Sequence, residues 1–463
     1  MLTAVLFFLS VPSVHVLGAQ ETGTDQRLSL SLEDAVRLGL ENNEQIQRAR
    51  EGINKAKGAV TEYRADAWPN ITGNATYTYN ILRPSTEMDI GGAMNEVLIS
   101  MGLEPIPPVE VDLVAPEEYV FNVGLTQNIY TFGRLHNAIK LAKLYVEIAQ
   151  TNLFLEEELV ELKVRSAYND ALYTRELVRI SRAAYDQARR HRENLAAKFE
   201  RGLISEYEYL RAEVEEVNRR PAVRKSKDAM ELAEKNLKRV IGLDLGEKIS
   251  LTDSFSRRMV KMEQSEAIRE AMDSRTELQL LRLKKESSLR EYRIYRSNML
   301  PALSAFSNYT YSGSESSGFG GSGDVEWYSF WDVGLQLYVP IFDGFRNMGR
   351  MKQAKADMTS AVLDILETEK GIRLEVEQIL LEMGSIEEEM EALRRAVDLA
   401  KRTVELVSIR YENGLATQVE VNDGETALVV AETNLADALY RYNGAGARLD
   451  RALGRRQIAE DSK

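Results

Sequence analysis

The chain has 463 residues, 10 prolines and no cysteine, and its formal net charge is −13. The absence of cysteine excludes thiol catalysis, cysteine-ligated zinc and disulfides, and it suits an oxidising compartment. The acidic balance, with Lys and Arg scattered along the chain, argues against nucleic acid as a partner.

Residues 1–19 form the first predicted segment. They contain no Lys, Arg, Asp or Glu, and the apolar stretch from Val5 to Leu17 is too short to span a bilayer. The small residues Gly18 and Ala19 follow it, so we expect a secretory signal peptide that is cleaved there. No later run approaches the ~18 apolar residues of a membrane helix, so any membrane crossing is expected to use strands.

Two copies of one unit make up most of the chain. A shift of 232 residues places Pro69 on Pro301, and a shift of 212 residues places Gly202 on Gly414. The 20 residues by which the copies differ lie between the two predicted strands of the first copy. We therefore divide the chain into a first repeat (20–242), a linker (243–262), a second repeat (263–454) and a polar tail (455–463).

Each repeat is predicted to contain a helix, two strands, a long helix and a shorter helix. Proline ends the first helix in both repeats, because the residue before a proline is pushed out of the α region. Alternating polar and apolar residues then predict the strands, which are separated by polar loops. A helix of about 66 residues follows each strand pair, and one of about 37 follows that. The predicted first helices are 32–67 and 264–299, the strands 70–80, 119–131, 302–312 and 329–342, and the loops 81–117 and 312–328.

The long helix of the second repeat carries a regular apolar seam. Between Ile372 and Tyr411, apolar or small residues are separated by alternating steps of four and three, the period of a left-handed coiled coil. Charged residues fill the positions between, so this helix needs partner helices along its length. The seam consists of Ile372, Val376, Ile379, Met383, Ile386, Met390, Leu393, Val397, Ala400, Val404, Val407 and Tyr411.

Both long helices are predicted to end in a tight tip turn, near 202–205 and 414–417. In the second turn, Gly414 suits the left-handed residue after a helix, and Leu415 the apolar contact that follows it. Thr417 suits the cap of the next helix. The residues predicted to form the two tips are Gly202, Leu203, Ser205, Tyr411, Gly414, Leu415 and Thr417.

The four strands are too few to close a barrel alone. Strands of ~11–12 residues, tilted by ~45°, suit a transmembrane barrel, but a closed barrel needs about eight strands. Open strand edges are not viable in lipid, so the barrel must be shared between chains. The expected fold is mixed α and β: a long α-helical coiled-coil barrel plus four transmembrane β-strands per chain, in two structural repeats.

In this order of elements, residues from about 30 to 454 resemble the TolC family of outer-membrane efflux channels. The motifs are Pro69 and Pro301, the run from Ile341 to Gly344, and the tip from Tyr411 to Thr417. The resemblance implies a homotrimer in the outer membrane with its helices in the periplasm. It implies a passive exit duct of a tripartite efflux or type I secretion system. Its partners would be a periplasmic adaptor, an inner-membrane pump and outer-membrane lipid.

The resemblance also implies a gate at the periplasmic tips. The family's acidic rings fall on Glu420 and Asp423, and an acidic position of the closing network falls on Glu208. Tyr411 matches the family's tip tyrosine, whereas Ala416 stands where one member has a locking arginine, so the sequence leaves open what replaces that lock. A second interpretation needs no gate, because Glu420 and Glu208 both fit the third position of a capping box.

No catalytic, cofactor or metal site is predicted. His136 and His191 stand alone on a long helix, and the glycine pattern from Gly318 to Gly323 lacks the strand–turn–helix context of a dinucleotide site. The alternative to a channel is a secreted coiled-coil scaffold or adhesin without a pore, which would be soluble without detergent. The sequence does not distinguish a drug, a metal ion or a protein as the transported substrate.

Overall fold

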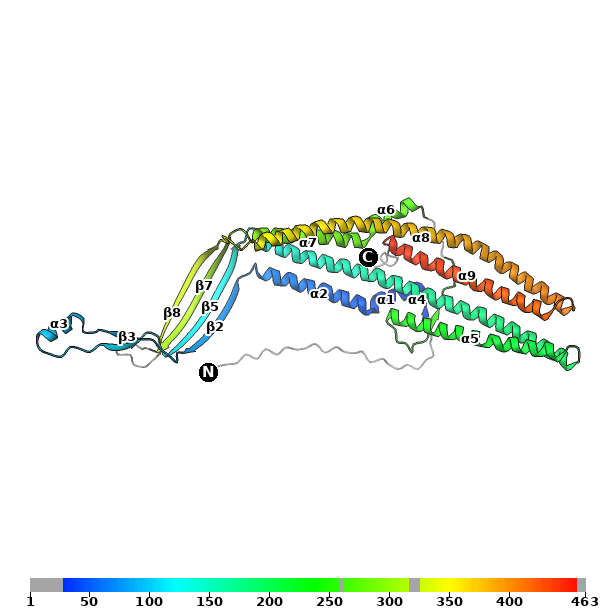
Figure 1. Ribbon diagram of the computed structural model, residues 1–463, viewed down its shortest axis with the longest axis horizontal. Coiled ribbons are helices and arrows are strands. Elements are labelled where there is room, and N and C mark those ends of the chain that lie inside the picture. The colour runs from blue at the N-terminus through cyan, green and yellow to red at the C-terminus, as the bar shows by residue number, and fades with distance from the viewer. Residues whose placement is uncertain (1–27, 258–261, 316–324, 456–463) are drawn as a thin grey trace.

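The computed structural model describes residues 28–257, 262–315 and 325–455. The predicted signal peptide, the glycine pattern in 318–323 and nearly all of the polar tail lie outside these residues. In Figure 1 the chain forms a long rod, with a β-sheet and a projecting hairpin at one end. At the other end lie the two tight turns that each connect a long helix to a shorter one. The helices fill the length between them.

Two long helices set the length of the helical part. They are α4 (Arg134–Glu200) and α8 (Arg346–Glu412), each of 67 residues and thus about 100 Å long. Two shorter helices follow one another along each of them. Helices α2 and α5 lie beside α4, whereas α7 and α9 lie beside α8 (Figure 1). Helix α4 also contacts α7 and α9, so the two halves of the chain pack together. The shorter helices are α2 (Glu44–Ala65), α5 (Glu206–Ile241), α7 (Thr276–Ser297) and α9 (Gln418–Ala452).

The helix that opens each half is broken, so the prediction of one continuous helix there is wrong. Helix α1 (Leu32–Asn42) is separated from α2 at Asn43, and α6 (Gln264–Ser274) is separated from α7 at Arg275. Both separating residues have extended backbone and serve as the cap of two helices at once. The two breaks lie 232 residues apart, the shift that relates these parts of the sequence.

A tertiary contact accounts for each break. The Asn43 side-chain amide donates a hydrogen bond of 3.0 Å to the carbonyl of Val240, near the end of α5. At the matching place in the second half, the Arg275 guanidinium donates to the carbonyl of Ala452, at the end of α9 (3.4 Å). Helix ends leave carbonyl groups without intrahelical partners, so these side chains satisfy groups that would otherwise be orphaned. The breaks thus join the stacked short helices end to end.

Each half has an apolar core of its own. In the first half, side chains from α1, α4 and α5 pack around Tyr168 and Ile241. In the second half, the seam of α8 packs against α9 and α6 around Tyr442 and Leu449. Burial of the seam follows the predicted spacing of four and three. Its buried members are Ile372, Val376, Ile379, Met383, Ile386, Met390, Val397 and Val404.

The sheet is antiparallel and open. Its strands lie in the order β2 (Asn70–Tyr79), β5 (Glu117–Tyr130), β7 (Ala302–Glu315) and β8 (Val325–Tyr338). Among the described residues, β2 pairs only with β5 and β8 only with β7, so both outer strands keep one free edge. Strand β8 ends four residues before its predicted end at 342, and Pro340, which lacks an N–H donor, follows closely.

The two faces of the sheet differ in polarity. On one face, apolar side chains sit opposite one another across the strands, as Ile71 does with Leu125 and Tyr309 with Trp331. On the other face, the Asn122 amide donates to the Thr310 hydroxyl. The apolar face is exposed in the single chain, where Trp331 is 74% accessible.

Aromatic rings cross the sheet on its apolar face, toward the projecting hairpin. The Tyr77 ring lies 5.1 Å from that of Tyr119, which lies 5.9 Å from Trp327, and Trp327 stacks on Tyr311 at 4.7 Å. Gly313 stands opposite Trp327, and a Cβ there would lie 2.8 Å from the indole ring. These four rings thus form a row near the strand ends that adjoin the hairpin.

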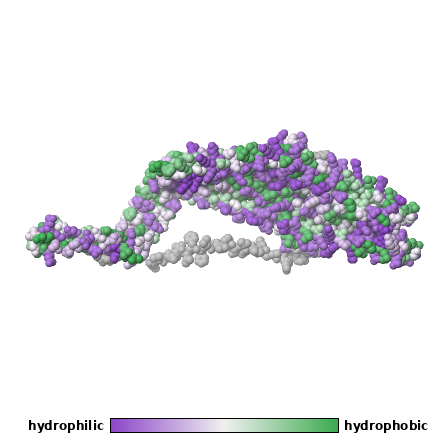
Figure 2. Space-filling model, viewed as in Figure 1, coloured by the Kyte–Doolittle hydropathy of each residue, from purple (hydrophilic) through white to green (hydrophobic). Residues whose placement is uncertain are grey.

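The insert between β2 and β5 is a folded hairpin, whereas the sequence predicts a polar loop. It consists of β3 (Ser85–Met88), α3 (Gly92–Ser100) and β4 (Val109–Asp112), with β3 paired to β4. It projects beyond the sheet, and hydrophobic residues are visible on its surface in Figure 2. Strands β3 and β4 have only four residues each, and the short apolar helix α3 has no clear periodicity. The sequence pattern of this insert therefore does not differ from that of a loop.

Deleting about 20 residues within Ser85–Pro107 is expected to leave the oligomeric state unchanged, because loop tips tolerate such changes when their backbone bonds stay internal. The backbone pairing of β3 is with β4 alone among the described residues. Native mass spectrometry in detergent would compare the variant with the full chain. Loss of the wild-type assembly would mean that the hairpin packs between chains.

A second, small sheet lies at mid-length. Strand β1 (Leu28–Leu30) pairs in parallel with β6 (Ile249–Leu251), which belongs to the linker between the halves. The Tyr168 hydroxyl oxygen lies 3.0 Å from the carbonyl oxygen of Leu30, so α4 contacts this sheet. The linker is thereby attached to the first half.

Candidate functional site at the helical tips

The first tip turn joins α4 to α5 as the sequence predicts. Gly202 has φ of 70°, and the Leu203 N–H donates to the carbonyl of Lys198 at 2.9 Å. Ser205 caps α5, with its hydroxyl accepting from the Glu208 N–H and the Glu208 carboxylate accepting from the Ser205 N–H. This reciprocal capping box is confirmed. The Leu203 side chain is 68% exposed.

The second tip turn repeats this geometry between α8 and α9. Gly414 has φ of 71°, and the Leu415 N–H donates to the carbonyl of Arg410 at 2.8 Å. The Arg410 guanidinium returns a bond of 3.1 Å to the carbonyl of Leu415. Thr417 and Glu420 form the predicted capping box, in which Glu420 accepts from the Thr417 N–H at 2.7 Å.

One detail of these turns departs from the prediction. The sequence predicts that Leu415 packs on the helix that it follows, yet its side chain is 68% exposed, as is that of Leu203. The turn is therefore held by backbone hydrogen bonds and by Arg410 rather than by an apolar contact. Two exposed leucines consequently mark the end of the rod.

Replacing Gly414 by Val is expected to open the second turn. A β-branched residue at positive φ costs on the order of 1–2 kcal/mol, which raises local opening roughly 5- to 30-fold. Limited trypsin digestion should show that increase at Arg410. Gly371→Ala in the middle of α8 serves as the control, because an added Cβ there meets no atom within 4 Å. Equal cleavage of both variants would contradict a strained tip.

The structure places the predicted acids in different settings. Glu208 and Glu420 both form the capping boxes that the sequence predicts, so capping is one role of each of them. Asp423 lies one turn further along α9 and is exposed. All three acids stand in the first turns of α5 and α9, at the end of the rod opposite the sheet (Figure 1).

Tyr411 links the second tip to the first. Its ring lies 5.4 Å from that of His191 on α4, and the Lys198 ammonium lies 5.9 Å from the centre of the Tyr411 ring. Burial raises the pKa of Tyr411, and the negative charge of Glu208 raises it further. Tyr411 and Glu208, which the sequence analysis selects separately, therefore interact electrostatically across the two halves.

His191 is a tip residue that sequence reasoning missed. Burial lowers its pKa, and the positive charge of Lys198 adds to that effect, so the imidazole favours its neutral form. No local pattern selects it, because its partner Tyr411 is more than 200 residues away in the chain.

A buried carboxylate lies deeper in the same region. Glu425 on α9 is 6% exposed and accepts a hydrogen bond of 3.0 Å from the Gln187 amide on α4. The Arg219 guanidinium on α5 lies 3.8 Å from its other oxygen. Burial raises the pKa of Glu425, with Arg219 and Gln187 opposing that rise. Sequence reasoning missed this residue too, because an isolated glutamate in a helix is usually solvated.

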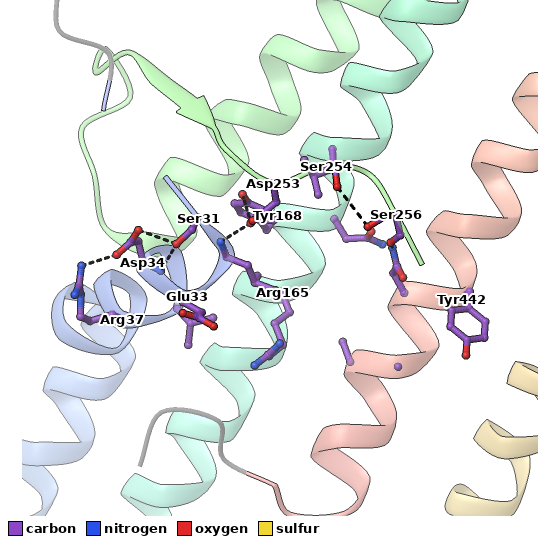
Figure 3. A pocket seen from close by; sticks show the side chains of 17 residues that line it. Ser31, Glu33, Asp34, Arg37, Arg165, Tyr168, Asp253, Ser254, Ser256 and Tyr442 are labelled. Carbon is purple, nitrogen blue, oxygen red and sulfur yellow. Dashed lines mark hydrogen bonds and ion pairs between the residues drawn. The ribbon is translucent and has the colours of Figure 1, made fainter. Parts of the chain in front are cut away.

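A cavity lies away from the tips, at mid-length between α1, α4, α9 and the linker. It has a volume of about 1030 Å³. Figure 3 shows the Tyr168 hydroxyl beside Asp253, to which it donates at 2.6 Å, and Asp34 between Ser31 and Arg37. These polar groups pair with one another, which indicates a role in holding the linker to the first half.

Neither a metal centre nor a membrane helix is found in the part of the chain that the structure describes. Within it, no three His, Asp or Glu side chains are grouped to hold a metal ion. None of the described helices combines the length and the apolar character needed to cross a membrane.

Comparison with known proteins assigns the family. The sequence model of the outer membrane efflux protein family matches residues 35–243 and again residues 267–455. The chain belongs to this family. It is therefore an exit duct in the outer membrane, and the expected localisation and resemblance are confirmed. A secreted scaffold without a pore is correspondingly excluded.

Individual relatives agree with this assignment. The alkaline protease secretion protein AprF of Pseudomonas aeruginosa is 23% identical over 441 residues, which cover 92% of this chain and 84% of AprF. Among solved structures, a membrane protein from Pseudomonas aeruginosa has a TM-score of 0.73 at 19% identity, covering 93% of this chain and 91% of its own. The Campylobacter jejuni CmeC outer membrane channel has a TM-score of 0.72 at 16% identity, with 96% and 93% covered. These structures share the fold of this outer membrane efflux protein.

Proposed function

We propose that the chain works as a homotrimer whose three sheets close into one transmembrane barrel of twelve strands. The open sheet carries this proposal. The described strands form a sheet with two free edges, one apolar face that carries a row of aromatic side chains, and one polar face. Free edges leave backbone groups unpaired in lipid, whereas a shared barrel pairs them all. The apolar face would meet lipid and the polar face would line the duct.

The helices would then form a periplasmic tunnel built from two repeats per chain. The heptad seam of α8, buried along most of its length, supports a coiled-coil barrel. The two family matches, to residues 35–243 and 267–455, support two repeats. The duct is passive, because the mechanism we propose uses only packing and charge at its tips.

The tips are the proposed gate. Three-fold symmetry would bring three copies each of Glu420 and Asp423 close to one axis, where their fields add. The contact of Tyr411 with His191, in the field of Glu208, would hold the second hairpin against the first in the closed state. Arg410, already bound to the turn, stands near Ala416 and is our candidate to replace the missing locking arginine.

The tips are also the proposed docking site for a periplasmic adaptor, which would connect the duct to an inner-membrane pump. Leu203 and Leu415 are exposed at the very end of the rod, where a partner could cover them. The similarity to AprF, named as a secretion protein, supports a type I secretion system, whereas the family description and CmeC support efflux.

Conductance in planar bilayers tests the proposed function. The purified chain should need detergent for extraction and should insert pores of one conductance level. A protein that stays soluble without detergent and inserts no pores would contradict the proposal.

A further inference from the structure

The contact between α9 and the first half of the chain combines one stacked pair of rings, Tyr173 and Tyr440 at 4.8 Å, with polar pairs at several points. At mid-length, the Asn169 amide on α4 donates to the carbonyl of Tyr440 at 3.0 Å. Nearer the tips, Arg179 pairs with Glu432 at 3.4 Å. The two apolar cores, by contrast, lie within the separate halves. Polar contacts exchange readily with water, so the interface between α9 and the first half is suited to separate during opening.

Glu425 is a buried acid at this interface, and neighbouring groups only partly compensate the negative charge of its ionised form. One of its oxygens accepts from Gln187, while Arg219 approaches the other at 3.8 Å and sits closer to Glu215, at 2.8 Å. Removing a carboxylate from water costs several kcal/mol, which a single neutral hydrogen bond and a shared, distant guanidinium do not fully repay.

Two further charges act on Glu425 in opposite directions. From α4, Arg190 lowers the pKa of Glu425, and from α5, Glu215 raises it. From α8, the apolar side chain of Val404 is the nearest neighbour that a Cβ added at the adjacent Gly424 would meet, at 3.6 Å, and Lys401 lies near Glu432 instead.

We propose that Glu425 is a proton-controlled positioning residue of the gate: its ionised form weakens the docking of α9 on α4 and α5, and its protonated form strengthens it. This inference rests on the proposed gating function of the tips. A neutral carboxyl removes the buried charge, keeps an oxygen that accepts from Gln187, and gains an O–H donor.

The sign of the pH effect follows from burial. When α9 is docked, burial raises the pKa of Glu425 above the value it has when α9 has moved into water. Docked α9 thus binds the proton more tightly than released α9. Its contribution to closure is complete below the ordinary glutamate pKa and is lost as pH rises through the raised value. Acidification is therefore expected to close the duct.

The test is the pH dependence of conductance in planar bilayers. Wild-type channels should conduct less at pH 5 than at pH 7.5, with the closed-to-open ratio changing up to ~10-fold per unit of pKa difference. Glu425→Gln should conduct at pH 7.5 as little as the wild type does at pH 5, and should lose the pH dependence. Gln187→Leu should have the opposite effect at pH 7.5, because it removes a donor to the carboxylate.

Glu432→Gln is the matched control. Glu432 lies two turns along the same helix and pairs with Arg179, so its neutralisation should leave the pH dependence in place. A Glu425→Gln channel that keeps the wild-type pH response, or opens more at pH 7.5, would overturn the inference. Pores that form normally in that case would leave the proposed function standing, whereas the absence of pores in the wild type would refute the function itself.

Discussion

Replacing Glu420 by Gln and Asp423 by Asn together is expected to abolish the cation preference of the channel and to weaken its block by multivalent cations. In the proposed trimer, six carboxylates converge on a narrow aqueous axis, and rings of acids select cations in this way. The two substitutions remove negative charge but keep the hydrogen bond that caps α9. A glutamine oxygen can still accept from the Thr417 N–H, as Glu420 does at 2.7 Å, and Asp423 is exposed beyond the box.

Reversal potentials measured across a salt gradient give the result directly. The Glu206→Gln variant is the control, because Glu206 is an exposed acid in the first turn of α5 that no proposed ring includes. The double variant should assemble like the wild type, since both caps persist. Unchanged reversal potentials would show that Glu420 and Asp423 face away from the axis, which would leave capping as the role of Glu420.

In detergent, the chain is expected to run as a trimer, with about three times the 52.3 kDa mass of the full-length chain, less any cleaved signal peptide. Within the described part of the chain, the free edges of β2 and β8 each carry unpaired backbone groups, and each such group costs several kcal/mol in lipid. Summed over a strand, this cost far exceeds the stability of a typical domain, so a lone sheet should not persist in the membrane. Native mass spectrometry measures the assembly, and a stable monomer in the absence of detergent would contradict it.

Periodic features of the fold were predictable from the sequence. The seam of α8 recurs every 3.5 residues and the strands alternate, so their type and approximate length follow from local pattern alone. The breaks at Asn43 and Arg275 could not be predicted this way. Each depends on a carbonyl of another helix, Val240 or Ala452, which the sequence places about 180 to 200 residues away. The helical pattern on either side continues in phase and hides the break.

The candidate site divides in the same manner. Gly202, Gly414 and the two capping boxes are local signals, and the structure has them where the sequence predicts. Glu425 and His191 gain their properties from partners in the other half of the chain. In the sequence, Glu425 resembles any solvated glutamate of a helix. In the structure, Gln187 donates a hydrogen bond to its carboxylate and Arg219 lies beside it. Only the packing of α9 on α4 and α5 distinguishes it.

The pairing of β1 with β6 has a consequence for how the protein is made. Leu28 lies opposite Ile249, so the amino-terminal strand finds its partner only after more than 200 further residues have emerged. Contacts between such distant residues form slowly, because a long loop must close first. Until then, the first half lacks one edge of its core and stays exposed to proteases. Completion of the linker is therefore expected to be the step at which the newly exported first half becomes resistant to digestion.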